Sequence, residues 1–172
     1  PFNLKELFDD IHRLLVGAAE NNSTQFQRHF PKDSPAYFLG DPRRFKQVLL
    51  NLVSNAIQST KLGNVDMKAS LLSTNDHRRV AMRIEVIDTG PGLSKEEQEN
   101  LFAFITQADA ITNRKFSEME LGLAVSHHIV EKMGSKIQLE SEWGHGSRFW
   151  FDIELPRASE DEISSIEVGR KT

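Results

Sequence analysis

Apolar residues along this chain follow two different periods, and this alternation constrains the fold more than any other feature. They recur at helical spacing over 4–18 and 45–57, and at strand spacing over 65–71, 80–86 and 149–155. Each amphipathic helix must bury its apolar stripe, and the alternating segments supply a sheet face for it to cover. The order of elements therefore predicts an α/β (α+β) two-layer sandwich, with helices packed on one face of a mixed, largely antiparallel sheet.

Local signals mark where the predicted helices begin. A capping residue followed three positions later by glutamate forms a capping box, and aspartate followed by proline is a frequent helix start. These signals occur at Asn3 with Glu6, at Asp41 with Pro42, and at Ser94 with Glu97. A further helix is predicted over 121–133, with Gly134 directly after its last turn.

The sequence predicts one ordered domain followed by a short tail. Pro156 ends the last alternating segment, and large apolar residues are rare beyond it. A segment with few apolar residues and many charges cannot bury enough surface to order itself. We therefore expect a single domain over 1–156 and a flexible acidic tail or linker over 157–172.

Composition excludes several classes of protein. The 172-residue chain has no cysteine, which excludes a disulfide scaffold, a thiolate metal site and a cysteine nucleophile. Its formal net charge of −4 argues against nucleic-acid binding, because phosphate neutralisation needs a basic face. No apolar run reaches the roughly 18 residues of a membrane span, and no secretory leader opens the sequence. We expect a soluble, cytoplasmic domain.

Two asparagines are the first candidates for chemistry. Asn51 and Asn55 are four residues apart in a predicted helix, so both amides lie on one face, one turn apart. A side-chain carbonyl there is a hard-oxygen ligand suited to Mg²⁺, which often binds beside substrate phosphates. The alternative is a pair of exposed or locally bonded amides.

Two glycine-rich turns are the next candidates. Asp88-Thr89-Gly90-Pro91-Gly92 follows an apolar strand directly, so its glycines permit a tight turn against a flat ligand. The Asp88 carboxylate can accept a hydrogen bond from the exocyclic amine of a purine, although an ordinary turn closed by an Asx bond is the alternative. The second turn is Gly144-His145-Gly146-Ser147, which also suits a plain hairpin.

Few other polar residues point to a ligand. Arg114 and Lys115 lie in a polar stretch from which they can reach phosphate oxygens, although solvated loop charges are the usual outcome. The six histidines share no ligand spacing with carboxylates, so none is assigned to a metal.

Together these stretches resemble the ATP-binding catalytic domain of sensor histidine kinases, within the gyrase/Hsp90/histidine-kinase/MutL superfamily. The resemblance covers about 1–156 and implies a Bergerat-type fold. The matching motifs are the N box at Asp41–Thr60, the first glycine box at Asp88–Leu93, the phenylalanine box at Leu101-Phe102 with Thr106–Asp109, the end of the second glycine box at Leu121–Leu123 and the third glycine box at Gly144–Ser147.

The resemblance implies ATP and Mg²⁺ as ligands. Asn55 and Asn51 would serve Mg²⁺ and the phosphates, Asp88 would bind adenine, and the stretch from Phe102 to Glu120 would form a lid. The implied nucleotide-binding residues are Asn51, Asn55, Gln58, Asp88, Gly90, Gly92, Phe102, Arg114, Lys115, Leu121, Gly122 and Ser147. The resemblance supplies no catalytic residue within the chain itself.

The resemblance also implies phosphoryl transfer to a histidine on separate dimerisation helices, with the acceptor upstream of Pro1. Asn51 stands where directly hydrolysing superfamily members have a glutamate, and an amide cannot take a proton from water. The stretch Thr106–Lys115 is similar to hybrid kinases, in which a receiver domain follows. The implied partners are the protein's own dimerisation helices, a receiver domain or response regulator, and another histidine kinase, within a membrane-anchored sensor.

Three departures from the family pattern fall on the phosphate side. Ser117-Glu118-Met119-Glu120 replaces the expected Gly-Gly-Thr-Gly, Gln58 replaces a lysine, and Phe102-Ala103-Phe104 lacks the expected proline. Glycine-rich helix starts bind phosphate through free backbone N–H groups, and a carboxylate there repels it. Two functions therefore stay open: a kinase weakened by its altered lid, or a pseudokinase that regulates another kinase by contact.

Overall fold

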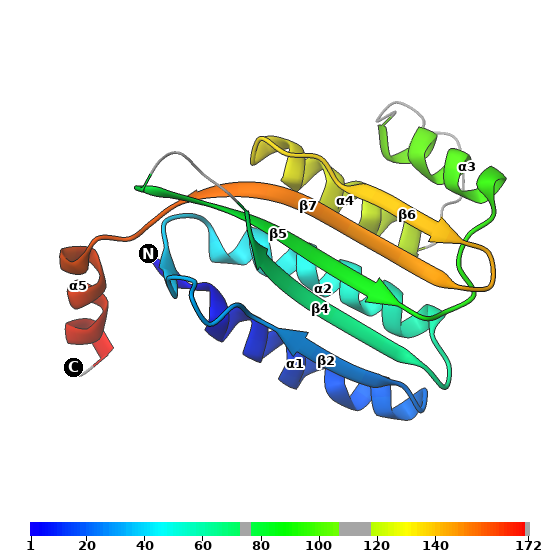
Figure 1. The fold of residues 1–172 in the computed structure, drawn as a ribbon, viewed down its shortest axis with the longest axis horizontal. Helices are drawn as coiled ribbons and strands as arrows, with labels where there is room; N and C mark the ends of the chain where they lie inside the picture. Colours follow the sequence, from blue (N-terminus) through cyan, green and yellow to red (C-terminus); the bar gives the residue numbers. More distant parts are fainter. Residues whose placement is uncertain (73–76, 107–117, 171–172) are drawn as a thin grey trace.

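The structure, a computed structural model, describes residues 1–72, 77–106 and 118–170. Five strands form one sheet in the order β2–β4–β5–β7–β6 (Figure 1). The strands are β2 (Gln25–His29), β4 (Asn64–Leu71), β5 (Arg79–Asp88), β6 (Gln138–Glu142) and β7 (Gly146–Pro156). Only β2 and β4 pair in parallel among these five, and the other neighbours are antiparallel. The predicted mixed, largely antiparallel sheet is confirmed.

Helices cover one face of this sheet, as predicted. In Figure 1 the helices α1 (Leu4–Asn21), α2 (Pro42–Ser59) and α4 (Glu118–Lys132) lie together behind the strands, and α3 (Lys95–Thr106) packs beside α4. The three predicted start signals are present in the structure. The backbone N–H of Glu6 donates to Asn3 Oδ1 at 3.0 Å, that of Arg43 to Asp41 Oδ1 at 3.0 Å, and that of Glu97 to Ser94 Oγ at 3.2 Å.

The core lies between the sheet and the apolar stripes of α1 and α2. Every second residue of β5 and β7 points toward the helices, so Ile84 and Phe151, which are register partners, are both fully buried. The ring of Phe45 from α2 lies 6.4 Å from that of Phe151 and links the helix layer to the central strands. This packing fixes α2 across the sheet.

The opposite face of the sheet carries charged residues that pair with one another. Arg148 Nε lies 3.1 Å from Glu85 Oε2, and the Arg148 guanidinium lies 4.1 Å from the ring centroid of Trp150. Arg83 is bound to Asp152 by two hydrogen bonds. Trp150 therefore belongs to the open face, away from the helices.

Two regions differ from the sequence-based expectations. The strands β1 (Phe2–Asn3) and β3 (Tyr37–Phe38) form a separate two-stranded sheet that no sequence pattern indicated. The segment predicted as a flexible tail instead carries α5 (Glu160–Arg170), although this helix has no buried residue. A capping box that the sequence analysis overlooked starts it, because the Glu162 carboxylate accepts the Ser159 N–H at 2.7 Å.

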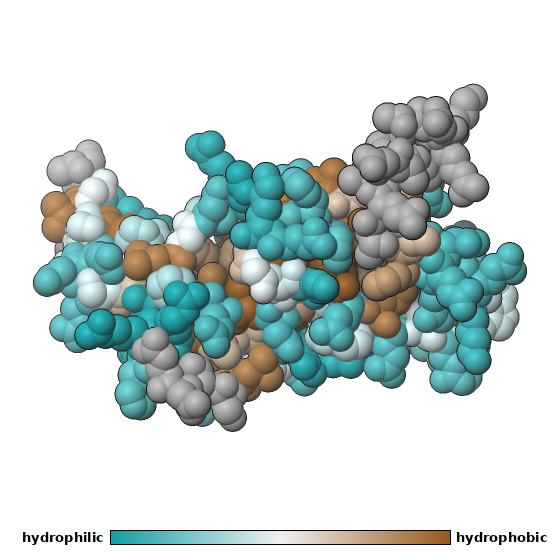
Figure 2. Space-filling model, turned by 90° about the horizontal axis from the view of Figure 1, so that it is seen from above, coloured by the Kyte–Doolittle hydropathy of each residue, from teal (hydrophilic) through white to brown (hydrophobic). Residues whose placement is uncertain are grey.

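Each helix in the part of the chain that the structure describes is too short or too polar to span a bilayer. The surface seen in Figure 2 is mostly hydrophilic, with apolar residues visible between polar ones and several of them close together. Leu121 and Val125, for example, are both exposed and lie one turn apart on α4.

We predict that Phe151→Ala lowers the free energy of unfolding by about 3–5 kcal/mol, since it leaves a cavity in the core. Phe102→Ala is the matched control, because that ring is 60% exposed and its loss should cost less than about 1 kcal/mol. Urea unfolding measures both. Equal losses for the two variants would contradict the packing described here.

Candidate functional site

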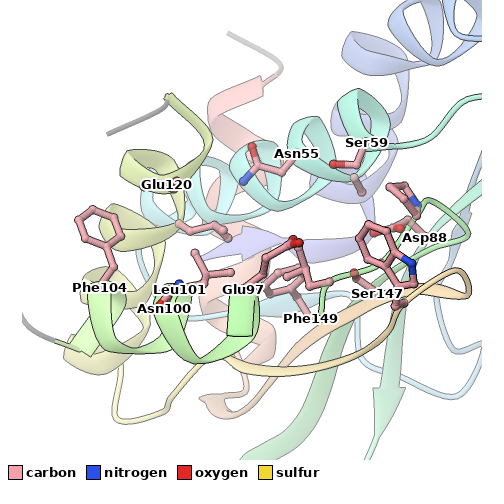
Figure 3. Close-up of a pocket in the computed structure, with 16 residues that line it drawn as sticks. Asn55, Ser59, Asp88, Glu97, Asn100, Leu101, Phe104, Glu120, Ser147 and Phe149 are labelled. Atoms are coloured by element: carbon pink, nitrogen blue, oxygen red, sulfur yellow. The ribbon is translucent and has the colours of Figure 1, made fainter. Parts of the chain in front are cut away.

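A cavity of about 810 Å³ lies between the helices and the ends of the central strands. Its volume lies within the usual range for sites that bind small molecules. Figure 3 shows an elongated space, with Asp88 and Ser147 toward one end and Glu120 and Phe104 toward the other. The lining residues are Asn55, Ala56, Ser59, Asp88, Pro91, Gly92, Leu93, Glu97, Asn100, Leu101, Phe104, Glu120, Leu123, Trp143, Ser147 and Phe149.

Asp88 is the buried polar group at one end of this cavity. It is the last residue of β5 and pairs with Ser147 on β7, so the central sheet fixes its position. Its Oδ1 accepts the Gly90 N–H at 2.9 Å, and the side chain also accepts from the Ser147 backbone. Burial raises the pKa of Asp88 above its ordinary value, and these two hydrogen bonds partly oppose the shift. The carboxylate retains further acceptor capacity toward the cavity.

Glycines allow the two turns beside Asp88 to pack in direct backbone contact. Gly92 has φ +71°, and a Cβ there would overlap the carbonyl oxygen of Glu142. Gly146 has φ +97°, and a Cβ there would overlap the carbonyl oxygen of Asp88. Both positions therefore require glycine for conformation and for space.

Ser141 joins the same two turns through its side chain and backbone. Its Oγ accepts the Leu93 N–H at 2.7 Å and donates to the Gly146 carbonyl at 2.9 Å. The Gln98 side chain donates to both the Leu93 and the Ser141 carbonyls at 2.9 Å, which attaches the first turns of α3. These hydrogen bonds within the protein thus connect the walls at the Asp88 end to one another.

The α2 wall presents Asn55 and Ser59, which are one turn apart, but not Asn51. Asn51 Nδ2 donates instead to the Gly122 carbonyl at 3.2 Å and to Ser126 Oγ at 3.1 Å. Since α4 crosses α2 at this turn, the Asn51 amide joins the two helices. The structure therefore does not place Asn51 beside Asn55 on the cavity wall.

The end of the cavity opposite Asp88 is acidic. Glu120 from α4 and Asn100 from α3 line it, together with the ring of Phe104, whereas Glu97 lies between the two ends (Figure 3). None of the described lining residues is lysine, arginine or histidine. A carboxylate repels a polyanionic ligand, and a cation between the two weakens this repulsion.

The remaining predicted site residues lie in several places. Gly92 and Ser147 line the cavity, and Gly90 contributes the N–H that binds Asp88. Gln58 is exposed and outside the lining, as are Phe102 and Leu121, which are 60% and 40% exposed. Gly122 contacts Asn51 rather than the cavity. Arg114 and Lys115 lie outside the described residues.

Several lining residues were missed by the sequence analysis. Glu97, Asn100, Leu101 and Phe104 follow the i, i+3, i+4, i+7 spacing of one helix face, so one face of α3 forms a wall. That spacing is present in the sequence, but the phenylalanine box of the resemblance indicated Phe102 as the site residue. Trp143 directly precedes the Gly144–Ser147 motif and was not among the predicted site residues.

Comparisons with known families and proteins agree with this geometry. The family model described as "Histidine kinase-, DNA gyrase B-, and HSP90-like ATPase" matches residues 40–157. The sensor protein GacS of Pseudomonas syringae pv. syringae is 38% identical over 168 residues, which are 98% of this chain and 18% of that protein. The signal transduction histidine-protein kinase BarA of Escherichia coli is 34% identical over 158 residues, 90% of this chain and 17% of that protein. The chain thus spans less than a fifth of the length of these relatives.

Solved structures show the same fold. Full-length ShkA in complex with AMPPNP superposes with a TM-score of 0.73 at 28% identity, covering 92% of this chain and 31% of that one. A nucleotide-free catalytic domain of the histidine kinase ThkA gives a TM-score of 0.65 at 25% identity, covering 92% and 97%.

We predict that Gly92→Ala destabilises the protein more than Gly144→Ala. Both glycines have positive φ, which costs alanine about 1–2 kcal/mol. Only at Gly92 does the new methyl also meet a backbone carbonyl, adding about 1–3 kcal/mol, whereas nothing lies within 4 Å at Gly144. Chemical denaturation of both variants tests this, and equal losses would refute the close packing of the turns.

The raised pKa of Asp88 predicts a pH dependence of stability. Below the ordinary pKa of 3.8, Asp88 is protonated in the folded and the unfolded chain. As pH rises, the unfolded chain ionises first, so Asp88 lowers the free energy of unfolding until it ionises in the folded state as well. Because asparagine does not ionise, Asp88→Asn lacks this pH-dependent loss in the free energy of unfolding.

Unfolding measured from pH 4 to pH 7 should therefore show the stability of Asp88→Asn, relative to the unsubstituted chain, improving as pH rises. Parallel curves, or a difference of opposite sign, would contradict the burial of this carboxylate.

Proposed function

Because the chain belongs to the family of histidine kinase-, DNA gyrase B- and HSP90-like ATPases, we propose that it is the ATP-binding catalytic domain of a sensor histidine kinase. In this role it presents ATP so that the γ-phosphoryl group passes to a histidine on separate dimerisation helices. The observation that carries the proposal is the buried Asp88 carboxylate at one end of a nucleotide-sized cavity.

The Asp88 end suits the adenine base. The ionised carboxylate accepts a hydrogen bond from the exocyclic amine of adenine, while Gly92 and Pro91 bring backbone close to the flat face of the ring. Leu93, Leu123 and Phe149 supply apolar surface in the same cavity. A guanine, with a carbonyl oxygen at the corresponding position, would meet the carboxylate unfavourably.

The opposite end suits the phosphates with Mg²⁺. Asn55, Asn100 and Glu120 carry the hard oxygen atoms that Mg²⁺ prefers, so the donor set there fits this ion (Figure 3). Asn55 and the phosphate oxygens would hold it, and the ion would neutralise phosphate charge. The residues of the chain orient the triphosphate and leave the γ-phosphoryl group for attack by an external imidazole.

A histidine kinase must keep its ATP from reacting with water. Asn51 has no group able to deprotonate water, and its amide is bound to Gly122 and Ser126 of α4. The α2 residue on the cavity wall, Asn55, is also an amide. This arrangement supports transfer to an external acceptor over direct hydrolysis.

The rest of the protein is part of the same proposal. The acceptor histidine lies outside this chain, on dimerisation helices that form its first partner. A receiver domain, in the same protein or in a separate response regulator, takes the phosphoryl group next, and a membrane anchor connects the whole to its signal.

A second candidate function is that of a pseudokinase that acts by contact with another histidine kinase. The observation that favours it is Glu120, which lines the phosphate end of the cavity where the resemblance expects glycine. A carboxylate about 4 Å from a phosphate oxygen adds repulsion of about 4 kcal/mol at an effective dielectric constant near 20. The two functions differ in phosphoryl transfer, because only the kinase labels a histidine from ATP.

We predict that calorimetric titration detects binding of ADP and ATP with Mg²⁺, and that Asp88→Asn weakens it by about 10- to 100-fold, the effect of losing one charged hydrogen bond. Asp66→Asn is the matched control, because Asp66 contacts His29 outside the cavity. Unchanged affinity in Asp88→Asn, or no heat at millimolar nucleotide, would refute the proposed base site.

We further predict that Glu120→Gly increases histidine labelling from radiolabelled ATP at least several-fold in the protein that carries its dimerisation helices. Glu120→Gln separates the two causes, since it removes the charge but restores no backbone freedom. Label on histidine in the unsubstituted protein supports the kinase. Its absence in all three proteins, with nucleotide still bound, favours the pseudokinase.

A further inference from the structure

Trp143 combines exposure with a place on the cavity wall. The indole lies in the turn between β6 and β7, is 65% exposed, and lines the same cavity as Asp88, Gly92 and Ser147. The other aromatic side chains of the lining, Phe104 and Phe149, are less exposed. An exposed indole at a cavity wall presents a large flat apolar face to whatever enters.

The backbone that carries Trp143 is held against the loop that follows Asp88. The carbonyl of Glu142 packs directly on Gly92, and the Gly144 N–H donates to the Pro91 carbonyl at 2.6 Å. The His145 N–H closes the turn on the Glu142 carbonyl at 2.9 Å. Backbone contacts thus fix both neighbours of Trp143, so the indole needs little ordering before it contacts a ligand.

We propose that Trp143 covers the nucleobase, with its indole stacked on the face of a purine whose amine is bound by Asp88. This inference rests on the proposed function and adds to it the residue that supplies the aromatic contact. The Gly92 backbone and the apolar residues Leu93 and Leu123 of the same cavity enclose the rest of the ring. Asp88 selects the base by its hydrogen-bonding edge, and Trp143 contributes affinity through the ring face that every purine has.

The chain contains two tryptophans, and they lie in different environments, so fluorescence can test this assignment. Trp150 lies on the open face of the sheet, with the guanidinium groups of Arg148 and Arg83 over its ring. It does not line the cavity. In Trp150→Phe all tryptophan emission comes from Trp143, whereas in Trp143→Phe it comes from Trp150.

The experiment titrates the 172-residue chain and these two variants with ADP and, separately, with tripolyphosphate, both with Mg²⁺ present. We expect ADP to quench the emission of Trp150→Phe and to leave that of Trp143→Phe unchanged. Tripolyphosphate, which has no base, should quench neither. Quenching that is equal in both single-tryptophan variants, or that occurs with tripolyphosphate, would overturn the proposal.

Affinity provides the second readout. Calorimetry should show ADP bound about 5- to 50-fold more weakly by Trp143→Ala, the usual effect of removing a base-stacking aromatic group, with partial recovery in Trp143→Phe. Because the indole is exposed, thermal unfolding of both variants should match that of the unsubstituted chain. Unchanged affinity in Trp143→Ala, with ADP still bound and dependent on Asp88, overturns the role of Trp143 alone. Absence of any ADP binding to the unsubstituted chain instead overturns the proposed function.

Discussion

The antiparallel pairing of β5 with β7 is the interaction on which the site depends. Its last pair, Asp88 with Ser147, brings the end of the central strand against the start of β7. The same register packs Gly146 on the Asp88 carbonyl and lets Ser147 donate to the Asp88 side chain. A shift of one residue would turn Asp88 to the charged outer face, because side chains alternate along a strand. The buried apolar residues that hold this register therefore also place the carboxylate.

The cavity is asymmetric in what it offers a ligand. One end has a single buried carboxylate held by backbone N–H groups and surrounded by close-packed turns. The other end has Glu120, Glu97 lies between the two ends, and the described lining holds no basic side chain. The ends thus suit different parts of one molecule, a neutral ring with a polar edge and a charged group that brings its own metal ion. The Glu120 carboxylate makes the second end sensitive to that ion.

Much of the fold was predictable because local and long-range signals agree. The capping residues Asn3, Asp41 and Ser94 begin helices as expected, and apolar alternation identified the central strands. The short pair β1–β3 was not predictable, since two-residue strands carry no periodicity. Helix α5 was missed because a low apolar content is typical of disordered segments, and the capping box at Ser159 and Glu162 was overlooked.

The site was predictable where backbone geometry requires particular residues, and less so where packing decides. Asp88 and Gly92 were predictable as site residues because they belong to the glycine-rich turn that directly follows an apolar strand. The position of Asn51 depends on how α4 crosses α2, which no spacing within α2 could reveal. The same holds for Phe104, which lines the cavity where the motif indicated Phe102.

The parallel pairing of β2 with β4 affects the order in which the chain reaches its native state. The hairpin of β4 and β5 closes over a short connection, but β2 reaches β4 only after α2 and its flanking segments are in place. Closing that longer loop costs more chain entropy. We therefore expect β2 to join the sheet late, and until it does so the hydrogen-bonding edge of β4 is open to association with other chains.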